Sequence, residues 1–479
     1  MLIRGAEIPG HDERLDVRIE DGRIAAVARA LTPRPDEALI EARGAALLPS
    51  LHDHHLHLCA LAAARASVPC GPPQTMDADT LARALREASA RLAEGEWLRG
   101  IGYHDSVAGA ISRDWLDEVL PERPVRIQHR SGRLWILNTR ALTLLQPDAE
   151  APLERVGGRL SGRLYDADGW LRARIGGLRP DLAAVGAELL AHGVTGVTDT
   201  SHHNGEGEWR HFAQARARGA LPQDLVAMGS AALDEVADGD GLWRGAHKFH
   251  LHDHALPEFE TLCRDIDRAH RAGRGAAFHC VTRGELVYAL AALREAGGNG
   301  ADRIEHAAVV PPELLAQLRE SRVAVVTQPH FIAERGDDYL REVLSEDRPW
   351  LYRVRGLLEA GVPVAYGSDA PYGDLNPWRA MQAAVRRRSA RDVLMGRDET
   401  LTPEQALDLF LAPLATPGLS PRRVVAGAPA DLCLLATSWR EARMDLSRVR
   451  VRLTLKRGVP LYQAPAPAGP RRYGLSGAG

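Results

Sequence analysis

The chain has 479 residues, of which 45% are hydrophobic and 26% are charged, the balance of a globular protein with a large core. Its formal net charge of -3 lacks the basic surplus of a nucleic-acid-binding protein, so no partner of that kind is expected. No apolar run approaches the roughly 18 residues of a membrane helix, and the N-terminus lacks a signal-peptide pattern. The five cysteines form no CxxC pair, which favours reduced thiols and a cytoplasmic location.

The two ends of the chain have the pattern of short strands separated by turns. Near the start, Glu20-Asp21-Gly22 stands between two strand-like runs and is typical of a hairpin. Near the other end, residues 449–455 alternate apolar and polar side chains. We therefore expect residues 1–46 and 416–463 to pair into one small β-sandwich. Residues 464–479 are rich in Ala, Pro and Gly and are predicted to be a flexible tail.

Between these ends, short apolar runs alternate with longer helical patterns. Seven runs follow the one that ends at His57, and they occupy residues 194–199, 225–228, 246–251, 276–279, 303–306, 323–327 and 362–366. Repeated β–α units predict a parallel sheet, and eight strands are the number that closes a barrel. The expected fold class is α/β, with a distorted (β/α)8 TIM barrel over residues 47–415. Residues from about 59 to about 190 do not follow this alternation of short apolar runs and helical patterns, and we interpret them as an insertion after the first strand.

Histidines and one aspartate occur where the predicted strands end. His55 and His57 are two residues apart, so they point to the same side of a strand. His279 and His306 each end an apolar run, and Asp369 follows the last run. The C-terminal ends of barrel strands converge on one face, so we expect these five side chains to meet. Imidazole and carboxylate groups bind divalent transition metals, and the sequence therefore predicts a metal site.

Lys248 is unusual because Lys248 and Lys456 are the only lysines among 60 basic residues. It stands in the predicted strand 246–251. A lysine amine can react with carbon dioxide to give a carbamate that bridges two metal ions, whereas arginine stays protonated. The alternative is a lysine paired with an acid such as Asp253, beside a single ion. We expect one or two divalent ions, with zinc as the default and iron, manganese or cobalt as ions that suit the same ligands.

The segment 47–57, Leu-Leu-Pro-Ser-Leu-His-Asp-His-His-Leu-His, resembles the Pro-Gly-Phe-x-Asp-x-His-x-His signature of the amidohydrolase superfamily, with Ser50 in place of the usual glycine. The match continues at residues 193–199, 303–307, 367–371 and 428–432. Segments 102–106, 117–125 and 135–142 run in the order found in the amidohydrolase-3 group, the YtcJ-like and N-substituted formamide deformylase-like proteins. The chain is most similar to that group.

This resemblance implies a distorted (β/α)8 barrel with a β-sandwich built from both chain ends. It implies a metal site, and it places Lys248 where many relatives carry a carboxylated lysine. The implied ligands are His55, His57, His279, His306 and Asp369. It is also compatible with a homodimer.

Two segments depart from the group's pattern. Ser131-Gly132-Arg133 replaces a histidine that usually follows Asp-Gly, and residues 280–283 replace the usual Ala-Ile-Gly-Asp-Arg. Both lie near the expected substrate pocket, so the identity of the substrate does not carry over.

The predicted activity is hydrolysis of a C–N bond in a small molecule, such as an amide, an N-formyl or N-acyl amine, a urea or a carbamate. A divalent ion lowers the pKa of water, Asp369 is the predicted proton-transfer group, and His306 is expected to help hold the oxyanion. One alternative is a heterocycle deaminase, although Thr282 stands where such enzymes of the superfamily usually have glutamate. The others are a catalytically silent metal-binding relative and a scaffold that the metal only stabilises.

Four further residues are candidates for contact with the substrate. His330 follows the seventh predicted strand, and Tyr103, His104 and Trp135 belong to the insertion. Aromatic rings and imidazoles are common in the walls of small-molecule sites. Ordinary packing is the alternative for each of them.

Overall fold

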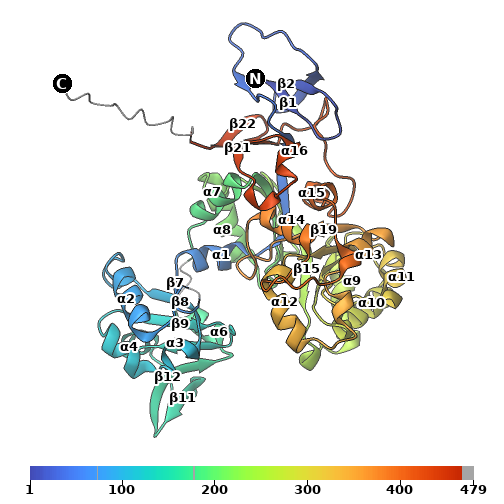
Figure 1. Cartoon of the computed structure of the whole chain (residues 1–479). Helices are drawn as coiled ribbons and strands as arrows, with labels where there is room; N and C mark the ends of the chain where they lie inside the picture. Colours follow the sequence, from blue (N-terminus) through green and yellow to red (C-terminus); the bar gives the residue numbers. More distant parts are fainter. Residues whose placement is uncertain (73, 176–178, 466–479) are drawn as a thin grey trace, which may run out of the picture. The chain divides into compact units, whose positions relative to one another are not determined.

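Eight parallel strands form the largest sheet of this computed structural model, which describes residues 1–72, 74–175 and 179–465 (Figure 1). Consecutive strands are neighbours in the sheet, so the order along the chain is also the order around the barrel. The strands are β6 (Leu51–Leu56), β13 (Val194–Asp199), β14 (Asp224–Gly229), β15 (Leu242–His250), β16 (Ala276–Cys280), β17 (Arg303–His306), β18 (Ala324–Thr327) and β19 (Val364–Tyr366). The predicted (β/α)8 barrel is confirmed.

Helices alternate with these strands and turn an apolar stripe toward the sheet. In α9 (Phe259–Arg271), for example, Leu262, Ile266 and Ala269 are buried at helical spacing. The other helices between barrel strands are α8 (Glu206–Ala217), α10 (Arg283–Ala296), α11 (Pro312–Glu320), α12 (Phe331–Glu342) and α13 (Val354–Glu359), while α7 (Ala183–Ala191) precedes β13 and α14 (Pro377–Arg386), α15 (Pro403–Leu411) and α16 (Trp439–Ala442) follow the last barrel strand. Among the described residues, none of the helices combines the length and apolar character that a membrane crossing requires.

The first and last strands of the barrel meet through the loop that follows β19. The Asp369 amide donates to the His55 carbonyl oxygen at 2.7 Å, and the His57 amide donates to the Ala370 carbonyl oxygen at 2.9 Å. At Gly367 a Cβ atom would lie 2.2 Å from the Cβ of His55, so only glycine allows this approach. The closure therefore places the two histidines of β6 beside Asp369.

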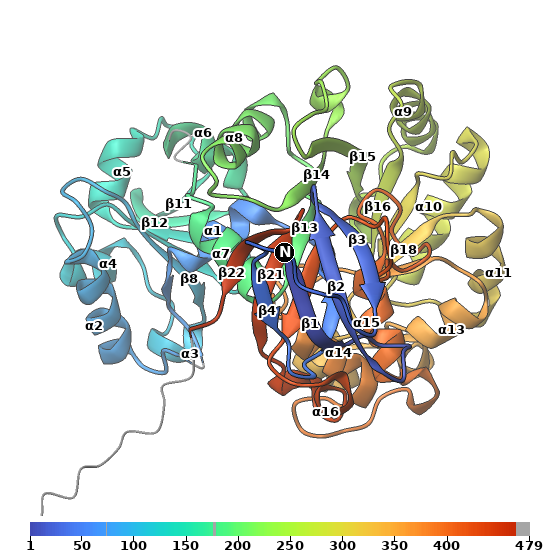
Figure 2. The same ribbon diagram turned by 90° about the horizontal axis from the view of Figure 1, so that it is seen from above.

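The two chain ends form two small sheets, each with four strands in the described residues, and residues 47–49, assigned above to the barrel, belong to the second of these sheets. One contains β1 (Leu2–Glu7), β2 (Arg14–Glu20), β3 (Arg23–Ala28) and β4 (Leu39–Glu41); the other contains β5 (Leu47–Pro49), β20 (Leu432–Leu435), β21 (Val451–Lys456) and β22 (Val459–Gln463). Ile3 and Val17 from the first sheet share a buried core with Leu432 and Leu453 from the second. Figure 2 shows the blue N-terminal strands beside the red C-terminal strands.

Residues Cys59–Asp181 form a separate unit, and helix α1 (Leu58–Arg65) leads into it. Its described residues build one six-stranded sheet in the order β11-β12-β10-β9-β8-β7. The strands are β7 (Val68–Pro69), β8 (Leu98–Tyr103), β9 (Val125–His129), β10 (Leu134–Leu137), β11 (Leu153–Val156) and β12 (Arg159–Tyr165), with helices α2 (Ala78–Ser89), α3 (Asp105–Ala108), α4 (Arg113–Val119), α5 (Thr139–Leu145) and α6 (Asp168–Ile175). This unit corresponds to the expected insertion, and α7 belongs to the first unit.

The predicted tail falls mainly on residues 466–479, which lie outside the described residues.

We expect Gly367→Ala to lower the free energy of unfolding by about 2–3 kcal/mol, because the added methyl group would force the loop away from β6. Denaturant unfolding of the full chain measures this change. Gly239→Ala is the matched control, since a Cβ there meets no atom within 4 Å, and its effect should stay within about 0.5 kcal/mol. Equal stability of the two variants would contradict the close approach.

Candidate metal centre

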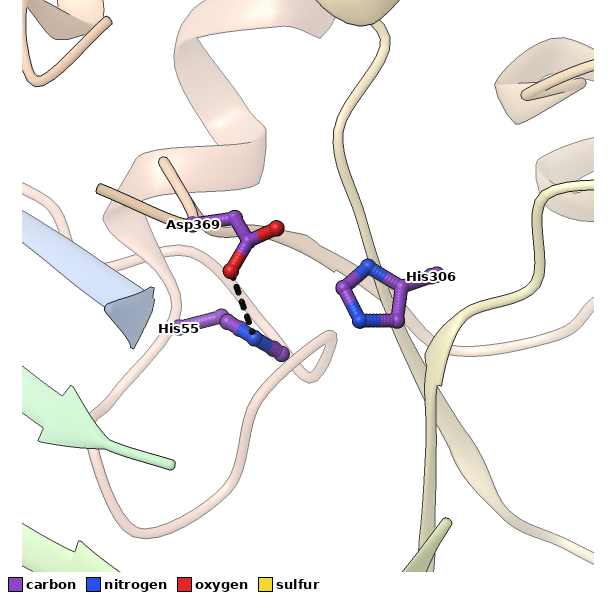
Figure 3. A group of neighbouring side chains, drawn as sticks. All are labelled: His55, His306 and Asp369. Carbon is purple, nitrogen blue, oxygen red and sulfur yellow. Dashed lines mark ion pairs between the residues drawn. The ribbon is translucent and has the colours of Figure 1, made fainter. Parts of the chain in front are cut away.

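Three side chains from distant strands converge at the C-terminal end of the barrel. One ligand atom from each of His55, His306 and Asp369 lies within 4.8 Å of the other two, and all three residues are buried (Figure 3). His55 belongs to β6, His306 ends β17, and Asp369 stands three residues after β19. Among the described residues no other His, Cys, Asp or Glu group is as tight.

The other predicted ligands surround this group. The Nε2 atoms of His55 and His57 both lie 3.3 Å from Oδ1 of Asp369, so two imidazoles share one carboxylate oxygen. The ring of His279 lies 4.5 Å from the ring of His306, measured between centroids. Lys248 in β15 is also buried, with 6% of its surface exposed. The barrel strands therefore bring together the side chains that the sequence predicts as metal ligands.

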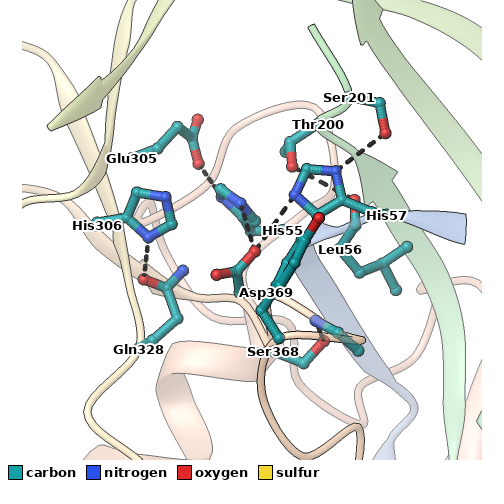
Figure 4. Close-up of polar contacts among 12 residues, drawn as sticks. His55, Leu56, His57, Thr200, Ser201, Glu305, His306, Gln328, Ser368 and Asp369 are labelled. Atoms are coloured by element: carbon teal, nitrogen blue, oxygen red, sulfur yellow. Dashed lines mark hydrogen bonds and ion pairs between the residues drawn. The ribbon is translucent and has the colours of Figure 1, made fainter. Parts of the chain in front are cut away.

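Three of the histidines are held through the ring nitrogen that faces away from the centre (Figure 4). The Nδ1 contacts are to Oε2 of Glu305 for His55 (2.5 Å), to Oγ of Ser201 for His57 (2.9 Å) and to Oε1 of Gln328 for His306 (2.8 Å). A metal-binding imidazole usually has its second nitrogen fixed in this way, which orients the ring and selects the tautomer. These contacts do not use the Nε2 atoms, and Nε2 of His55 and of His57 lies beside Asp369.

These three supporting residues were not among the sequence-predicted site residues. The sequence feature that could have indicated one of them is Glu305, a glutamate inside the apolar run that ends at His306. Glu305 is fully buried, and it accepts hydrogen bonds from the Arg303 guanidinium at 2.6 and 3.1 Å. The same guanidinium donates to the His54 carbonyl oxygen at 2.7 Å, which ties β17 to β6. Ser201 and Gln328 follow strands β13 and β18 and have no distinctive pattern.

The charges of the centre hold Asp369 in its ionised form. Burial alone would raise the pKa of this carboxyl, but hydrogen bonds from His55 and His57 lower it well below its usual range. Burial alone would lower the pKa of His55, and the charges of Glu305 and Asp369 outweigh burial and raise it. Burial, followed by the charge of His55, lowers the pKa of His306 to about 3. The pKa values of His55 and His306 are therefore shifted in opposite directions beside an ionised Asp369.

The Lys248 amine is buried, and its Nζ makes no hydrogen bond within the described part of the chain. The suggested pairing with Asp253 is therefore wrong. Burial lowers the pKa of Lys248 to about 8, against the attraction of Glu305. Burying a charged amine without a partner costs free energy. This cost favours either loss of the Lys248 proton or binding of a ligand by the amine.

The backbone is unusual at two of the converging residues. His306 has a φ of 68° and Asp369 a φ of 54°, both in the left-handed region that non-glycine residues seldom adopt. Each such residue costs of order 1–3 kcal/mol and persists only where the surrounding structure imposes it, as at functional sites. For Asp369, the hydrogen bond from its amide to β6 provides this restraint.

His330, which the sequence predicts to contact the substrate, is packed within the fold. Its side chain is buried, with 2% of the residue exposed, and both ring nitrogens are used within the fold. The Tyr366 hydroxyl lies 2.5 Å from Nδ1, and Nε2 donates to the Ser368 carbonyl oxygen at 3.1 Å. Its function in the structure is to support the loop that carries Asp369.

Tyr103 and Trp135 are also packed inside the fold, and a contact of either residue with the substrate stays a prediction. The Tyr103 hydroxyl donates to the Gly109 carbonyl oxygen at 2.5 Å, and its ring belongs to a buried apolar cluster. Trp135 is 5% exposed, and the guanidinium carbons of Arg99 and Arg126 each lie 5.5 Å from its ring centre. Large rings are favoured in cores because they bury much apolar surface.

His104 is partly buried and caps helix α3. Its side chain accepts a hydrogen bond from the Ser106 amide, and Nδ1 lies 2.7 Å from the Ser106 hydroxyl. A contact between His104 and the substrate stays a prediction.

The residues at the centre fit a divalent transition metal. Imidazole nitrogen and carboxylate oxygen are ligands that such ions prefer, and the outer nitrogens of three rings are already fixed. The Lys248 amine, buried without a partner among the described residues, adds a third type of group that could face an ion.

Comparison with known proteins gives one consistent result. A model described as the amidohydrolase family matches residues 38–462. N-substituted formamide deformylase from Arthrobacter pascens is 25% identical over 530 aligned positions, which cover 93% of this chain and 94% of that protein. The YtcJ protein of Bacillus subtilis (strain 168) is 23% identical, with 75% and 76% covered.

Solved structures show the same fold. An uncharacterized metal-dependent hydrolase from Pyrococcus horikoshii OT3 superposes with a TM-score of 0.76 at 19% identity, over 91% of this chain and 96% of the other.

We expect Glu305→Gln to weaken metal binding about 10- to 100-fold, because His55 loses the carboxylate that orients its ring. Competition with a chromophoric chelator measures the dissociation constant. Glu399→Gln is the control, since Glu399 is a buried glutamate that pairs with Arg353 and not with a ligand. The same dissociation constant in both variants would rule out this role for Glu305.

Proposed function

The chain belongs to the amidohydrolase family, and we propose that it is a metal-dependent enzyme that hydrolyses a C–N bond in a small molecule. The observation that carries this proposal is the contact of His55 and His57 with one oxygen of Asp369, while the outer nitrogens of both rings are fixed by Glu305 and Ser201. Such an arrangement is typical of a catalytic metal site.

His55, His57 and Asp369 would hold one ion, and His279, His306 and Lys248 would hold a second. When bound, a divalent ion lowers the pKa of water and polarises a carbonyl group. We propose zinc, because the donors are mostly imidazoles.

The residues of the chain supply the proton transfers. The Asp369 carboxylate, held ionised by its two histidines, would accept a proton as the water oxygen attacks the carbonyl carbon. Asp369 would return that proton to the nitrogen as the C–N bond breaks, which gives a carboxylic acid and an amine. Gln328 would contribute a hydrogen bond to the substrate oxygen, since its Nε2 is buried without a partner among the described residues.

N-formyl or N-acyl amines are the substrate class that we favour. The support is the similarity to a formamide deformylase over nearly the whole chain.

Deamination of a heterocycle is disfavoured by Thr282. Its side chain accepts the Glu285 amide hydrogen bond at 3.1 Å and caps helix α10, so it is committed to the helix start. A hydroxyl in that position also cannot act as a carboxylic acid.

We expect Asp369→Asn to lower the rate of hydrolysis at least about 100-fold, because an amide cannot accept the proton. The measurement uses a panel of N-formyl amines, N-acyl amines, ureas and carbamates, with metal content recorded for each preparation. Asp392→Asn is the matched control, since Asp392 is an exposed loop residue with a left-handed backbone that asparagine tolerates. Unchanged turnover in metal-loaded Asp369→Asn would exclude Asp369 as the base.

We expect two ions per chain when the protein is prepared with zinc and bicarbonate, and one ion in Lys248→Met. With a pKa of about 8, about half of the Lys248 amines are neutral at pH 8, and the neutral Nζ can attack carbon dioxide and release a proton. Elemental mass spectrometry counts the ions. Lys456→Arg is the control, because Lys456 donates to Asp224 at 2.6 Å and lies outside the centre. Two ions in Lys248→Met would exclude a bridging carbamate.

A further inference from the structure

Four histidines outside the predicted ligand set gather at the ends of β13 and β15, two strands that Figure 2 labels. His202 follows β13, His250 is the last residue of β15, and His252 and His254 lie in the turn after it. The ring centroids are 5.0 Å apart for His202 and His250, 4.3 Å for His250 and His252, and 5.5 Å for His252 and His254. The four rings form an uninterrupted row, which we call the outer histidine row.

The spacing in the outer row equals that of the candidate ligands in the centre. There the centroids are 5.6 Å apart for His55 and His57, 4.8 Å for His55 and His306, and 4.5 Å for His279 and His306. Imidazole rings at this separation can each direct one nitrogen to a shared ion, for which the metal–nitrogen distance is about 2.0–2.1 Å.

The outer row is continuous with the centre. The ring of His250 lies 4.4 Å from that of His279, and the ring of His252 lies 6.2 Å from it. His279 in turn contacts His306, so one histidine separates the row from the central group. An ion held by the row would therefore lie beside the centre without sharing its carboxylate.

The rings of the outer row lie at the surface. His202, His250, His252 and His254 are all exposed, and in the described residues the last three make no side-chain hydrogen bond or ion pair. The tightest group of ligand atoms is confined to the centre, so the outer rings would converge by rotating about their own side-chain bonds. Asp253 adds a carboxylate between two of them.

We propose that the outer histidine row is a second, peripheral site for a divalent transition-metal ion such as zinc. Neutral imidazoles suit zinc, copper, nickel and cobalt, whereas magnesium and calcium select oxygen ligands and should not bind. The affinity is lower than that of the centre, because ordering four exposed side chains costs conformational entropy.

Isothermal titration of the metal-free full chain with zinc tests this site. We expect the wild type to show a weak binding phase of about one ion per chain in addition to the tight phase of the centre. His202→Ala/His252→Ala should lose the weak phase and retain the tight one. Magnesium should give no weak phase in either protein.

His104→Ala/His129→Ala is the matched control, since it also removes two neighbouring histidines, whose rings are 6.0 Å apart, and lies in the other unit. It should keep both phases. A weak phase that survives in His202→Ala/His252→Ala, or that is absent from the wild type, would overturn the proposal. The titration measures ion binding alone, so a failure to find a hydrolysed substrate does not affect its outcome.

Discussion

The candidate centre depends on how the barrel closes. Backbone hydrogen bonds join the end of β6 to the loop after β19, and they run in both directions between residues 55–57 and 369–370. This contact is the reason that two histidines and an aspartate, more than 300 residues apart in the chain, share one small volume. Because the Asp369 amide takes part in it, the same contact restrains the left-handed backbone of that residue. The backbone contact that closes the barrel therefore also positions the residues of the candidate centre.

A buried electrostatic network supports this contact from the side of β17. Arg303 and Glu305 form an ion pair with almost no solvent exposure, and each partner also reaches β6, through His54 and His55 respectively. Buried ion pairs often add little net stability, but they define geometry because their partners cannot be left unpaired. Here the pair fixes both the register of two strands and the orientation of one candidate ligand. In contrast, Lys248 is buried nearby, and its Nζ has no hydrogen-bond partner in the described residues.

Histidine is used in three physical settings on this one barrel face. His330 is a structural residue, because both of its nitrogens are committed to the fold. His55, His57 and His306 each have Nδ1 in contact with a side chain outside the predicted ligand set. The four histidines of the outer row are exposed. The partners of the ring nitrogens therefore distinguish the packed His330 from candidate ligands such as His55 more clearly than residue type does.

The sequence by itself determined the strand order, the pairing of the two chain ends and the residues at the strand ends, because periodic burial and chain order are local properties. It also identified Lys248, through the scarcity of lysine. The tertiary structure alone revealed Glu305, Ser201 and Gln328 as partners of the histidines, since those contacts join residues up to 250 positions apart. It also decided that Tyr103, Trp135 and His330 are packed, because whether a ring lines a site or a core depends on neighbours that no local pattern specifies.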